Sequence, residues 1–146
     1  MDKLKIKKLY ENSVIPTRAT CGSAGFDLYA YCPESVTVNP NCTEKISVGI
    51  AVAIEESNLA GFIYARSGIS TKYGVAPANC VGVIDSDYRG EVFVPLHNYS
   101  SEPFTVTDKM RIAQLIISPV LTPEIVICEE LSDTERNTGG FGSSGL

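Results

Sequence analysis

The segment from Ile46 to Ile54 carries the clearest pattern in the sequence. Its even-numbered positions are all Ile or Val, whereas its odd-numbered positions are Ser, Gly or Ala. Successive side chains of a β-strand point to opposite faces, so this period of two predicts a strand with its branched side chains in the core. The small residues on the other face indicate that this side of the strand is also closely packed.

Short apolar runs separated by turn residues make up most of the remaining chain. The 12 Gly and 8 Pro residues are scattered between these runs, and no long segment shows the 3.6-residue period of a helix. We therefore predict an all-β fold, a barrel or a sandwich, with one short helix from Ser67 to Tyr73. Ser67 is expected to cap the start of this helix, and Gly74 to take the left-handed conformation past its end. Further strands are expected at residues 4–9, 26–30, 36–38, 61–65, 81–84, 90–97, 104–106 and 112–118.

Length and charge exclude several classes of protein. At 146 residues the chain has the size of one domain. Its net charge of −5 argues against broad nucleic-acid binding, which needs clustered Lys and Arg. No apolar run approaches the roughly 20 residues of a spanning helix, and the Lys-rich start lacks the apolar stretch of a secretory signal. We therefore expect an intracellular protein, cytoplasmic or nuclear and not secreted, that binds no membrane and no nucleic acid.

Cysteine and histidine residues indicate no metal or redox chemistry. The five cysteines are widely spaced, without a Cys-x-x-Cys pair, so we predict reduced thiols rather than disulfides or a zinc site. The single histidine, His97, lies in an apolar run typical of a strand, and we expect it to be structural. One histidine also excludes a two-histidine metalloprotease site.

Two internal segments carry groups suited to phosphate chemistry. In the first, Arg66, Ser67 and Gly68 precede the predicted helix, whose free N–H groups would help to hold a phosphate; the alternative is a capped helix with a solvated arginine. In the second, Asp85 and Asp87 follow an apolar strand. If extended, the two carboxylates share one face roughly 7 Å apart, and one of them is a candidate general base. The alternative is a β-turn whose Asp side chains bond the local backbone.

The C-terminal segment, residues 133–146, is predicted to be a flexible arm attached to a β domain of residues 1–132. Residues 136–145 are too rich in Gly and Ser to form a core strand. Arg136, Phe141 and the surrounding glycines would suit an arm that folds over a ligand, stacking on a base and donating N–H groups to phosphates. Taken alone, the same composition also fits a disordered tail.

Five segments together resemble the five motifs of the dUTPase family, in the family's order. They are Ala24-Gly25-Phe26-Asp27-Leu28, Arg66-Ser67-Gly68, Gly82 to Gly90, Arg111-Ile112-Ala113-Gln114-Leu115 and Arg136 to Gly145. The resemblance implies a distorted jelly-roll-like β-barrel that assembles as a homotrimer, with each active site built from all three chains. It also implies hydrolysis of dUTP to dUMP and pyrophosphate, which limits uracil in DNA and supplies dUMP for dTMP synthesis.

The resemblance also assigns roles to residues. Asp85 would be the base that orients and deprotonates a water for attack on the α-phosphorus. The hairpin from Asn79 to Tyr88 would admit the uracil, and the Tyr88 ring would pack against the deoxyribose so that a ribose 2′-hydroxyl is rejected. The implied substrate-binding residues are Arg66, Ser67, Gly68 and Gln114 at the phosphates, Asn79, Gly82, Val83, Ile84 and Tyr88 at the nucleoside, and Arg136, Phe141, Gly142, Ser143 and Ser144 on the arm of another subunit.

Mg²⁺ is the implied cofactor, bound through the substrate triphosphate, because one chain's arginines do not balance the charge of a triphosphate. Asp27 is expected to reach the ion only through water and not as a direct ligand. Its alternative role is that of an edge-loop Asp bonded to nearby backbone. Asp87, Arg89 and Arg111 are expected to brace the hairpin through ion pairs rather than to contact substrate.

The sequence departs from the family pattern at a few positions. Ala65 replaces a frequent Pro, Asn137 a frequent Gly and Ser144 a frequent Thr. Before the fourth motif the family often reads Gly-Asp-Arg, whereas this chain has Asp108-Lys109-Met110-Arg111. A turn glycine is therefore lost and a carboxylate is moved, so this turn is where we expect local geometry to be affected.

Two other functions fit parts of the pattern. A dCTP deaminase of the same superfamily shares the barrel and phosphate motifs but needs a carboxylate base beside C4 of the pyrimidine, and the hairpin has only the dUTPase pattern. A dUTPase-like domain retained for nucleotide-gated or partner binding is a non-enzymatic alternative, because a fold does not fix a function. The presence of Asp85, Tyr88 and the arm favours the enzyme.

Overall fold

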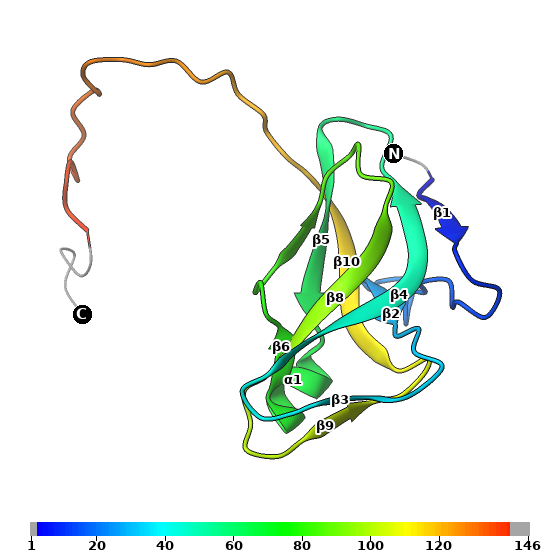
Figure 1. The fold of residues 1–146 in the computed structure, drawn as a ribbon. Helices are drawn as coiled ribbons and strands as arrows, with labels where there is room; N and C mark the ends of the chain where they lie inside the picture. Colours follow the sequence, from blue (N-terminus) through cyan, green and yellow to red (C-terminus); the bar gives the residue numbers. More distant parts are fainter. Residues whose placement is uncertain (1–2, 141–146) are drawn as a thin grey trace.

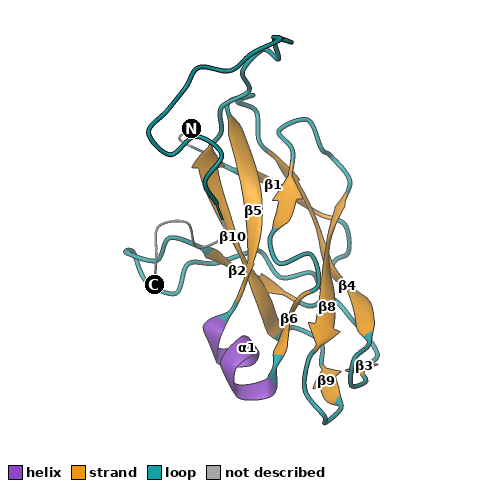
Figure 2. Ribbon diagram, turned by 90° about the vertical axis from the view of Figure 1, so that its left-hand side faces the viewer, coloured by secondary structure: helices purple, strands orange, loops and turns teal. Residues whose placement is uncertain are grey.

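A computed structural model describes residues 3–140 of the chain (Figure 1). These residues form ten strands and one helix, α1 (Ser67–Tyr73), so the predicted β fold with one short helix is confirmed (Figure 2). The predicted strands are all present, with ends shifted by no more than three residues. The strands are β1 (Lys5–Lys8), β2 (Phe26–Tyr29), β3 (Val36–Val38), β4 (Thr43–Ala53), β5 (Leu59–Ala65), β6 (Val75–Pro77), β7 (Gly82–Ile84), β8 (Glu91–Asn98), β9 (Phe104–Val106) and β10 (Arg111–Pro119).

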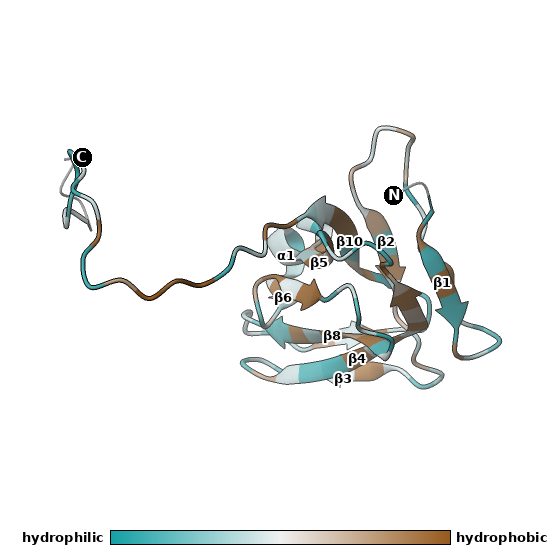
Figure 3. Cartoon of the chain, turned by 90° about the horizontal axis from the view of Figure 1, so that it is seen from above, coloured by the Kyte–Doolittle hydropathy of each residue, from teal (hydrophilic) through white to brown (hydrophobic). Residues whose placement is uncertain are grey.

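The strands pair in three antiparallel sheets, with the orders β1-β4-β8-β6, β2-β10-β5-β7 and β3-β9. The two four-stranded sheets form two layers, and seen from above β4 and β8 lie across from β5 and β10 (Figure 3). Within residues 3–140 no pairing joins the two larger sheets edge to edge, so the described chain does not form a closed barrel. The core is therefore the space between two facing sheets.

The strongly alternating segment forms the C-terminal part of β4 as far as Ala53, and Ile54 follows the strand directly. Its five Ile and Val side chains are at most 2% exposed, which confirms the predicted core face. Pairing with β8 shifts its register between Ser47 and Ala51, where Gly49 has a φ of 69°. A Cβ at Gly49 would also lie 3.0 Å from the Tyr31 Cβ and would clash with the Ser13 hydroxyl. Glycine is thus required at this bulge both for its backbone conformation and for space.

Helix α1 follows β5 without a loop. The prediction that Ser67 caps this helix is wrong, because Ser67 is already its first helical residue. Arg66 is the residue before the helix, with φ −91° and ψ 127°, and its side chain makes no capping hydrogen bond. The backbone stays extended through Arg66 and turns helical at Ser67, so the helix begins one residue earlier than a Ser67 cap requires. Gly74 ends the helix with a φ of 65° and donates its N–H to Ser70 O, as predicted.

Strand β6 has no signal in the sequence. Its three residues, the last of them Pro77, are too few to show a period of two, and only pairing with β8 makes them a strand. The next residue, Ala78, donates its N–H to Pro95 O at 2.7 Å. The chain is therefore anchored to β8 immediately before it turns into β7.

The lone histidine and the cysteines occupy separate places in the fold. His97 Nδ1 shares a hydrogen bond of 2.8 Å with Thr43 Oγ1, which joins β8 to β4, and its ring packs beside Tyr99. All five cysteines are free thiols, and only Cys32 is buried. Burial, together with the nearby Asp108 carboxylate, raises the pKa of the Cys32 thiol above its usual value.

Beyond Pro119, where β10 ends, the described chain leaves the sheets (Figure 1). Residues 120–140 include no strand and no helix. Several large apolar side chains here are between 76% and 96% exposed, and Figure 3 shows an apolar stretch along this segment. They are Leu121, Ile125, Val126, Ile127 and Leu131. The division into a domain of residues 1–132 and an arm of residues 133–146 stays a prediction. No helix of the described chain is both long and apolar enough to cross a membrane.

Candidate functional site

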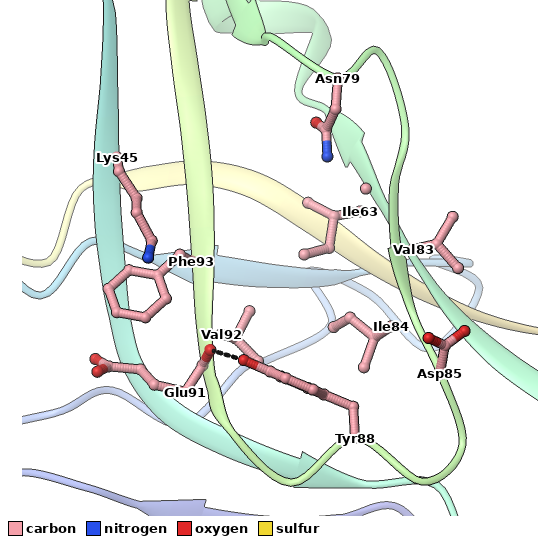
Figure 4. A pocket seen from close by; sticks show the side chains of 11 residues that line it. Lys45, Ile63, Asn79, Val83, Ile84, Asp85, Tyr88, Glu91, Val92 and Phe93 are labelled. Carbon is pink, nitrogen blue, oxygen red and sulfur yellow. Dashed lines mark hydrogen bonds between the residues drawn. The ribbon is translucent and has the colours of Figure 1, made fainter.

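Strand β7 and the turns on either side of it line a pocket of about 270 Å³ (Figure 4). Since β7 is the edge strand of its sheet, the sheet does not use the N–H and C=O groups along its outer edge. These groups are available to read the donors and acceptors of a ligand. The predicted nucleoside residues and the predicted base all line this pocket: Asn79, Gly82, Val83, Ile84, Asp85 and Tyr88.

The two aspartates after β7 lie in a turn. Tyr88 N donates to Asp85 O at 3.1 Å and closes the turn, so the Asp-Ser-Asp segment is not extended. The β-turn of the alternative is found, but within residues 3–140 no Asp side chain of this turn bonds the local backbone. The strand ends at Ile84 because the chain must reverse to enter β8. Asp85 is exposed, and among residues 3–140 no donor binds its carboxylate. That carboxylate is consequently free to accept a proton from a water at the pocket.

The side chains that follow this turn bind backbone oxygens. The Tyr88 hydroxyl donates to Glu91 O at 2.9 Å, which is drawn in Figure 4. Arg89 Nη1 donates to Ser86 O at 2.7 Å and to Tyr88 O at 2.8 Å. Arg89 therefore braces the turn, as expected, but through carbonyl oxygens rather than through an ion pair with Asp87.

A second group of predicted residues gathers where β2, β5 and β10 lie side by side. Asp27 on β2 accepts from Arg66 Nε at 2.9 Å and pairs with Arg111 Nη1 at 3.3 Å. The Asp27 side chain is only 12% exposed, so its alternative role as an edge-loop Asp is wrong. Arg111 pairs with Asp27 and not with the hairpin, which corrects its expected bracing role. Two guanidinium groups on one carboxylate leave one uncompensated positive charge.

Beside this cluster lies a pocket of about 200 Å³, lined by Asp27, Arg66, Ser67, Gly68 and Gln114 among others. Gln114 Nε2 donates to Ala65 O at 2.9 Å, which orients the amide next to the start of α1. The arrangement of a fixed cation, hydroxyl groups and amide groups suits a phosphate chain. All four predicted phosphate residues therefore line one pocket.

Whether side chains of this chain can bind a magnesium ion directly depends on which carboxylates have unused oxygens. Both oxygens of Asp27 already accept from arginines, and in the part of the chain that the structure describes no three His, Cys, Asp or Glu side chains cluster as metal ligands. Phosphate oxygens would therefore have to supply the direct ligands of the ion. Asp27, held at the edge of the phosphate pocket, fits a contact through water.

The hairpin and the cationic cluster do not meet within one chain. Ile84, next to Asp85, pairs with Gly61 of β5. Arg66 follows the end of β5, five residues after Gly61. At the rise of an extended strand, this distance is roughly 17 Å. The predicted base and the predicted phosphate arginine thus lie at opposite ends of β5.

The arm residues are only partly described. Arg136 Nε donates to Gly139 O at 2.9 Å, and Asn137 has a φ of 47°. Asn137 stands where the family often has glycine, and Asn tolerates this left-handed conformation better than most residues. The remaining predicted arm residues, Phe141, Gly142, Ser143 and Ser144, lie outside the described residues.

The turn before the fourth motif keeps a glycine-like conformation without glycine. Lys109, two residues before Arg111, has a φ of 61°, and Met110 N donates to Thr107 O at 3.1 Å. A side chain in this conformation costs on the order of 1 kcal/mol. The moved carboxylate, Asp108, accepts from the backbone N of Cys32 at 3.2 Å. The departure therefore keeps the turn and adds some strain to it.

Besides the core residues Ile63 and Val92, three residues of the hairpin pocket have no counterpart in the predicted set. Lys45 of β4 and Phe93 of β8 line the pocket, with Lys45 Nζ 3.8 Å from the centre of the Phe93 ring. Glu91 lines it as well and accepts from Ser47 Oγ at 2.5 Å. Nothing local in the sequence marks these residues, because only the pairing of β4 with β8 brings them together.

Fold and site define a class of protein: a β protein that binds a phosphorylated ligand and presents a free carboxylate for water chemistry. The dUTPase family model matches residues 11–145. The chain is 43% identical over 150 residues to the deoxyuridine 5′-triphosphate nucleotidohydrolase of Desulfitobacterium hafniense (strain DSM 10664 / DCB-2), covering 100% of this chain and 99% of that protein. This protein belongs to the dUTPase family.

Solved structures agree with this membership. The dUTPase of Staphylococcus bacteriophage 80alpha with bound dUPNHPP has a TM-score of 0.90 and 29% identity, with full coverage of both chains. A variant dUTPase from phage phi11 of S. aureus, described with a structural Mg(II) ion, has a TM-score of 0.79 and 25% identity, over 88% of this chain and 98% of that one.

Proposed function

We propose that this chain hydrolyses dUTP to dUMP and pyrophosphate. The observation that carries the proposal is the Asp85 carboxylate, which no donor among residues 3–140 binds, at a pocket whose edge strand exposes its backbone groups. Membership of the dUTPase family, and relatives named as deoxyuridine triphosphate nucleotidohydrolases, support the same reaction. In a cell this activity limits uracil in DNA and supplies dUMP for dTMP synthesis.

In this proposal Asp85 orients a water and accepts its proton as the water attacks the α-phosphorus. The new bond joins the water oxygen to that phosphorus, and the bond to the bridging oxygen breaks, so pyrophosphate leaves. A positioned base of this kind contributes about 10²–10⁴-fold to a rate. The position of Asp85 in a turn closed by Tyr88 N supports the role, since the turn fixes the backbone from which the carboxylate projects.

Recognition of the base is assigned to the hairpin. The outer edge of β7 offers backbone groups at Gly82, Val83 and Ile84, and Asn79 adds a side-chain amide on the same wall. Backbone donors and acceptors match the N3–H and carbonyl pattern that distinguishes uracil from cytosine. The Tyr88 ring, 44% exposed, offers a face for the deoxyribose.

The phosphates are assigned to Arg66, Ser67, Gly68 and Gln114, whose side chains and backbone line one pocket. Mg²⁺ bound to the triphosphate oxygens would neutralise charge on the leaving pyrophosphate. Asp27 would contact the ion through water while it fixes the Arg66 guanidinium. An ordered guanidinium binds phosphate in a defined geometry at a lower entropic cost than a free one.

The assembly belongs to the same proposal. A homotrimer of jelly-roll-like β domains, with active sites shared among the chains, would bring the hairpin of one chain to the cationic cluster of another. The roughly 17 Å between the two groups within one chain supports a shared site. The exposed apolar residues of segment 120–131, which precedes the arm, support a segment that is covered by a neighbour. Arg136 and Phe141 to Ser144 would then close over that neighbour's site.

The first test of the activity is pyrophosphate release from dUTP, dTTP, dCTP and UTP in parallel, with and without Mg²⁺. The expected result is release from dUTP alone, and only with the ion present. Binding of dUTP without release would favour the non-enzymatic domain. Deamination of dCTP would show that the hairpin reads cytosine, and would contradict the assignment of its backbone groups.

The shared site is tested by mixing two defective chains. Asp85→Asn lacks the base, and a chain truncated after Asp133 lacks the arm. Each variant alone lacks one part of every site. If sites are shared between chains, a mixed trimer would bring the intact hairpin of the truncated chain to the intact arm of the Asp85→Asn chain. After co-refolding at equal amounts, about a quarter of wild-type activity is expected from the statistics of threefold assembly. No recovery in a mixture that forms trimers would contradict the shared site.

A further inference from the structure

The ring of Tyr88 lies against its own chain two residues further on. A Cβ at Gly90 would lie 2.6 Å from Tyr88 Cζ and 3.0 Å from Cε2, and it would meet the hydroxyl oxygen as well. These distances are below those of ordinary van der Waals contact, so the ring and a Cβ at this position exclude each other. The observed ring position therefore requires the absence of a side chain at Gly90.

The backbone at Gly90 does not itself demand glycine. Among residues 3–140 the glycines with positive φ are Gly49 and Gly74. An alanine at position 90 would thus meet no strain from its φ, and any effect of Gly90→Ala would arise through the Tyr88 ring.

A second contact holds the same, hydroxyl end of the ring. The Tyr88 hydroxyl donates to Glu91 O at 2.9 Å, at the first residue of β8 (Figure 4). The Glu91 carboxylate accepts from Ser47 Oγ at 2.5 Å, and that oxygen also accepts from Gly49 N at 2.9 Å. The carbonyl that binds the hydroxyl is therefore tied to the bulge of β4. The hydroxyl end of the ring is therefore fixed by this hydrogen bond and lies in the space that Gly90 leaves open.

We infer that Gly90 is a positioning residue for sugar recognition, because it leaves the space in which the Tyr88 ring is held at the pocket. This inference rests on the proposed function, in which the ring packs against the deoxyribose. A fixed ring cannot yield to a ribose 2′-hydroxyl, and this hydroxyl would lose water without gaining a partner. A ring displaced by a Cβ at position 90 would leave room for the hydroxyl and for its water.

The test compares kcat/KM for dUTP and for UTP in four proteins: the wild type, Gly90→Ala, Tyr88→Ala and the double variant. Gly90→Ala is expected to lower the dUTP-to-UTP ratio on the order of tenfold. In the Tyr88→Ala background the same substitution should change the ratio by less than about twofold, because no ring is left to displace. An unchanged ratio in Gly90→Ala, or equal changes in both backgrounds, would overturn the inference.

The same four proteins also distinguish an effect on sugar recognition from a failure to fold. If Gly90→Ala does not fold but the double variant does, the ring is the obstacle, and Tyr88→Phe then tests its anchoring. Loss of the hydroxyl contact should lower the ratio, and an unchanged ratio would overturn the inference. If neither Gly90→Ala nor the double variant folds, glycine is needed for another reason and the inference fails. A wild type without dUTP hydrolysis would instead refute the proposed function itself.

Discussion

The hairpin and the cationic cluster solve different problems with different parts of the chain. At the hairpin, the outer edge of β7 offers backbone groups, and the turn after it presents the Asp85 carboxylate, which no donor among residues 3–140 binds. At the cluster, Asp27 and two arginines interlock on three adjacent strands with little exposure of the carboxylate. The difference shows that the donor and acceptor pattern of a base can be recognised by backbone groups. Recognition of phosphate charge instead needs side chains that are held in place by one another. Substitutions in the hairpin should therefore alter catalysis without affecting stability, and those in the cluster should affect both.

The largest effect is expected from Asp85→Asn. The amide cannot accept a proton from water, so kcat should fall about a thousandfold, within the range of general-base catalysis. Because Asp85 is exposed and its carboxylate has no partner in residues 3–140, the melting temperature should stay within about 1 °C of the wild type. Steady-state kinetics and thermal unfolding measure the two. Turnover like that of the wild type would refute the role of Asp85.

Removal of the arm should rank second. Truncation after Asp133 removes the proposed stacking on uracil and the Arg136 guanidinium, so kcat/KM should fall about a hundredfold by comparison with other base–aromatic contacts. The unfolding transition should not change, since residues 120–140 add no strand to the sheets. Phe141→Ala provides the matched control, with a smaller loss of about 1–3 kcal/mol in transition-state binding. Equal activity of the truncated and full chains would show that the arm has no role in the reaction.

Asp27→Asn should disrupt the cationic cluster by removing the negative charge at its centre. Both arginines would lose an anionic partner, and with Arg111 half exposed we expect a loss of about 2 kcal/mol in the free energy of unfolding. KM for dUTP should rise as well, because Arg66 loses its anchor. The exposed Asp87 is the control: Asp87→Asn should leave stability unchanged in urea unfolding. If both variants unfold alike, the ion pairs do not stabilise the cluster.

The smallest effect concerns the turn that leads into the cluster. Lys109→Gly should relieve the left-handed strain and stabilise the chain by about 0.5 kcal/mol, after the entropy that glycine adds to the unfolded state. Lys109→Ala keeps the strain but removes the charge, and it should bring no gain. Differential scanning calorimetry of the two variants separates the contributions, and an equal gain in both would point to charge rather than backbone.

Much of the site was predictable because its signals are local. The motifs placed the predicted nucleoside residues on one pocket and the predicted phosphate residues on another. The wrong predictions concern the backbone of single short segments. Asp85 and Asp87 lie in a turn because the chain must enter β8, and Ser67 is helical because β5 stays extended to Arg66. In both cases a neighbouring strand decided the backbone that short-range preferences left open.

By itself the sequence determined the class of fold, the order of most strands and the chemical groups at each motif, because alternation, turn residues and motif spacing act over a few residues. Tertiary structure alone decided that Asp27 lies between arginines 39 and 84 positions away, and that Glu91 is tied to Ser47 of another strand. It also decided that the two halves of the site lie at opposite ends of β5. Such contacts depend on strand pairing and register over long separations in the chain, for which a single sequence carries no local signal.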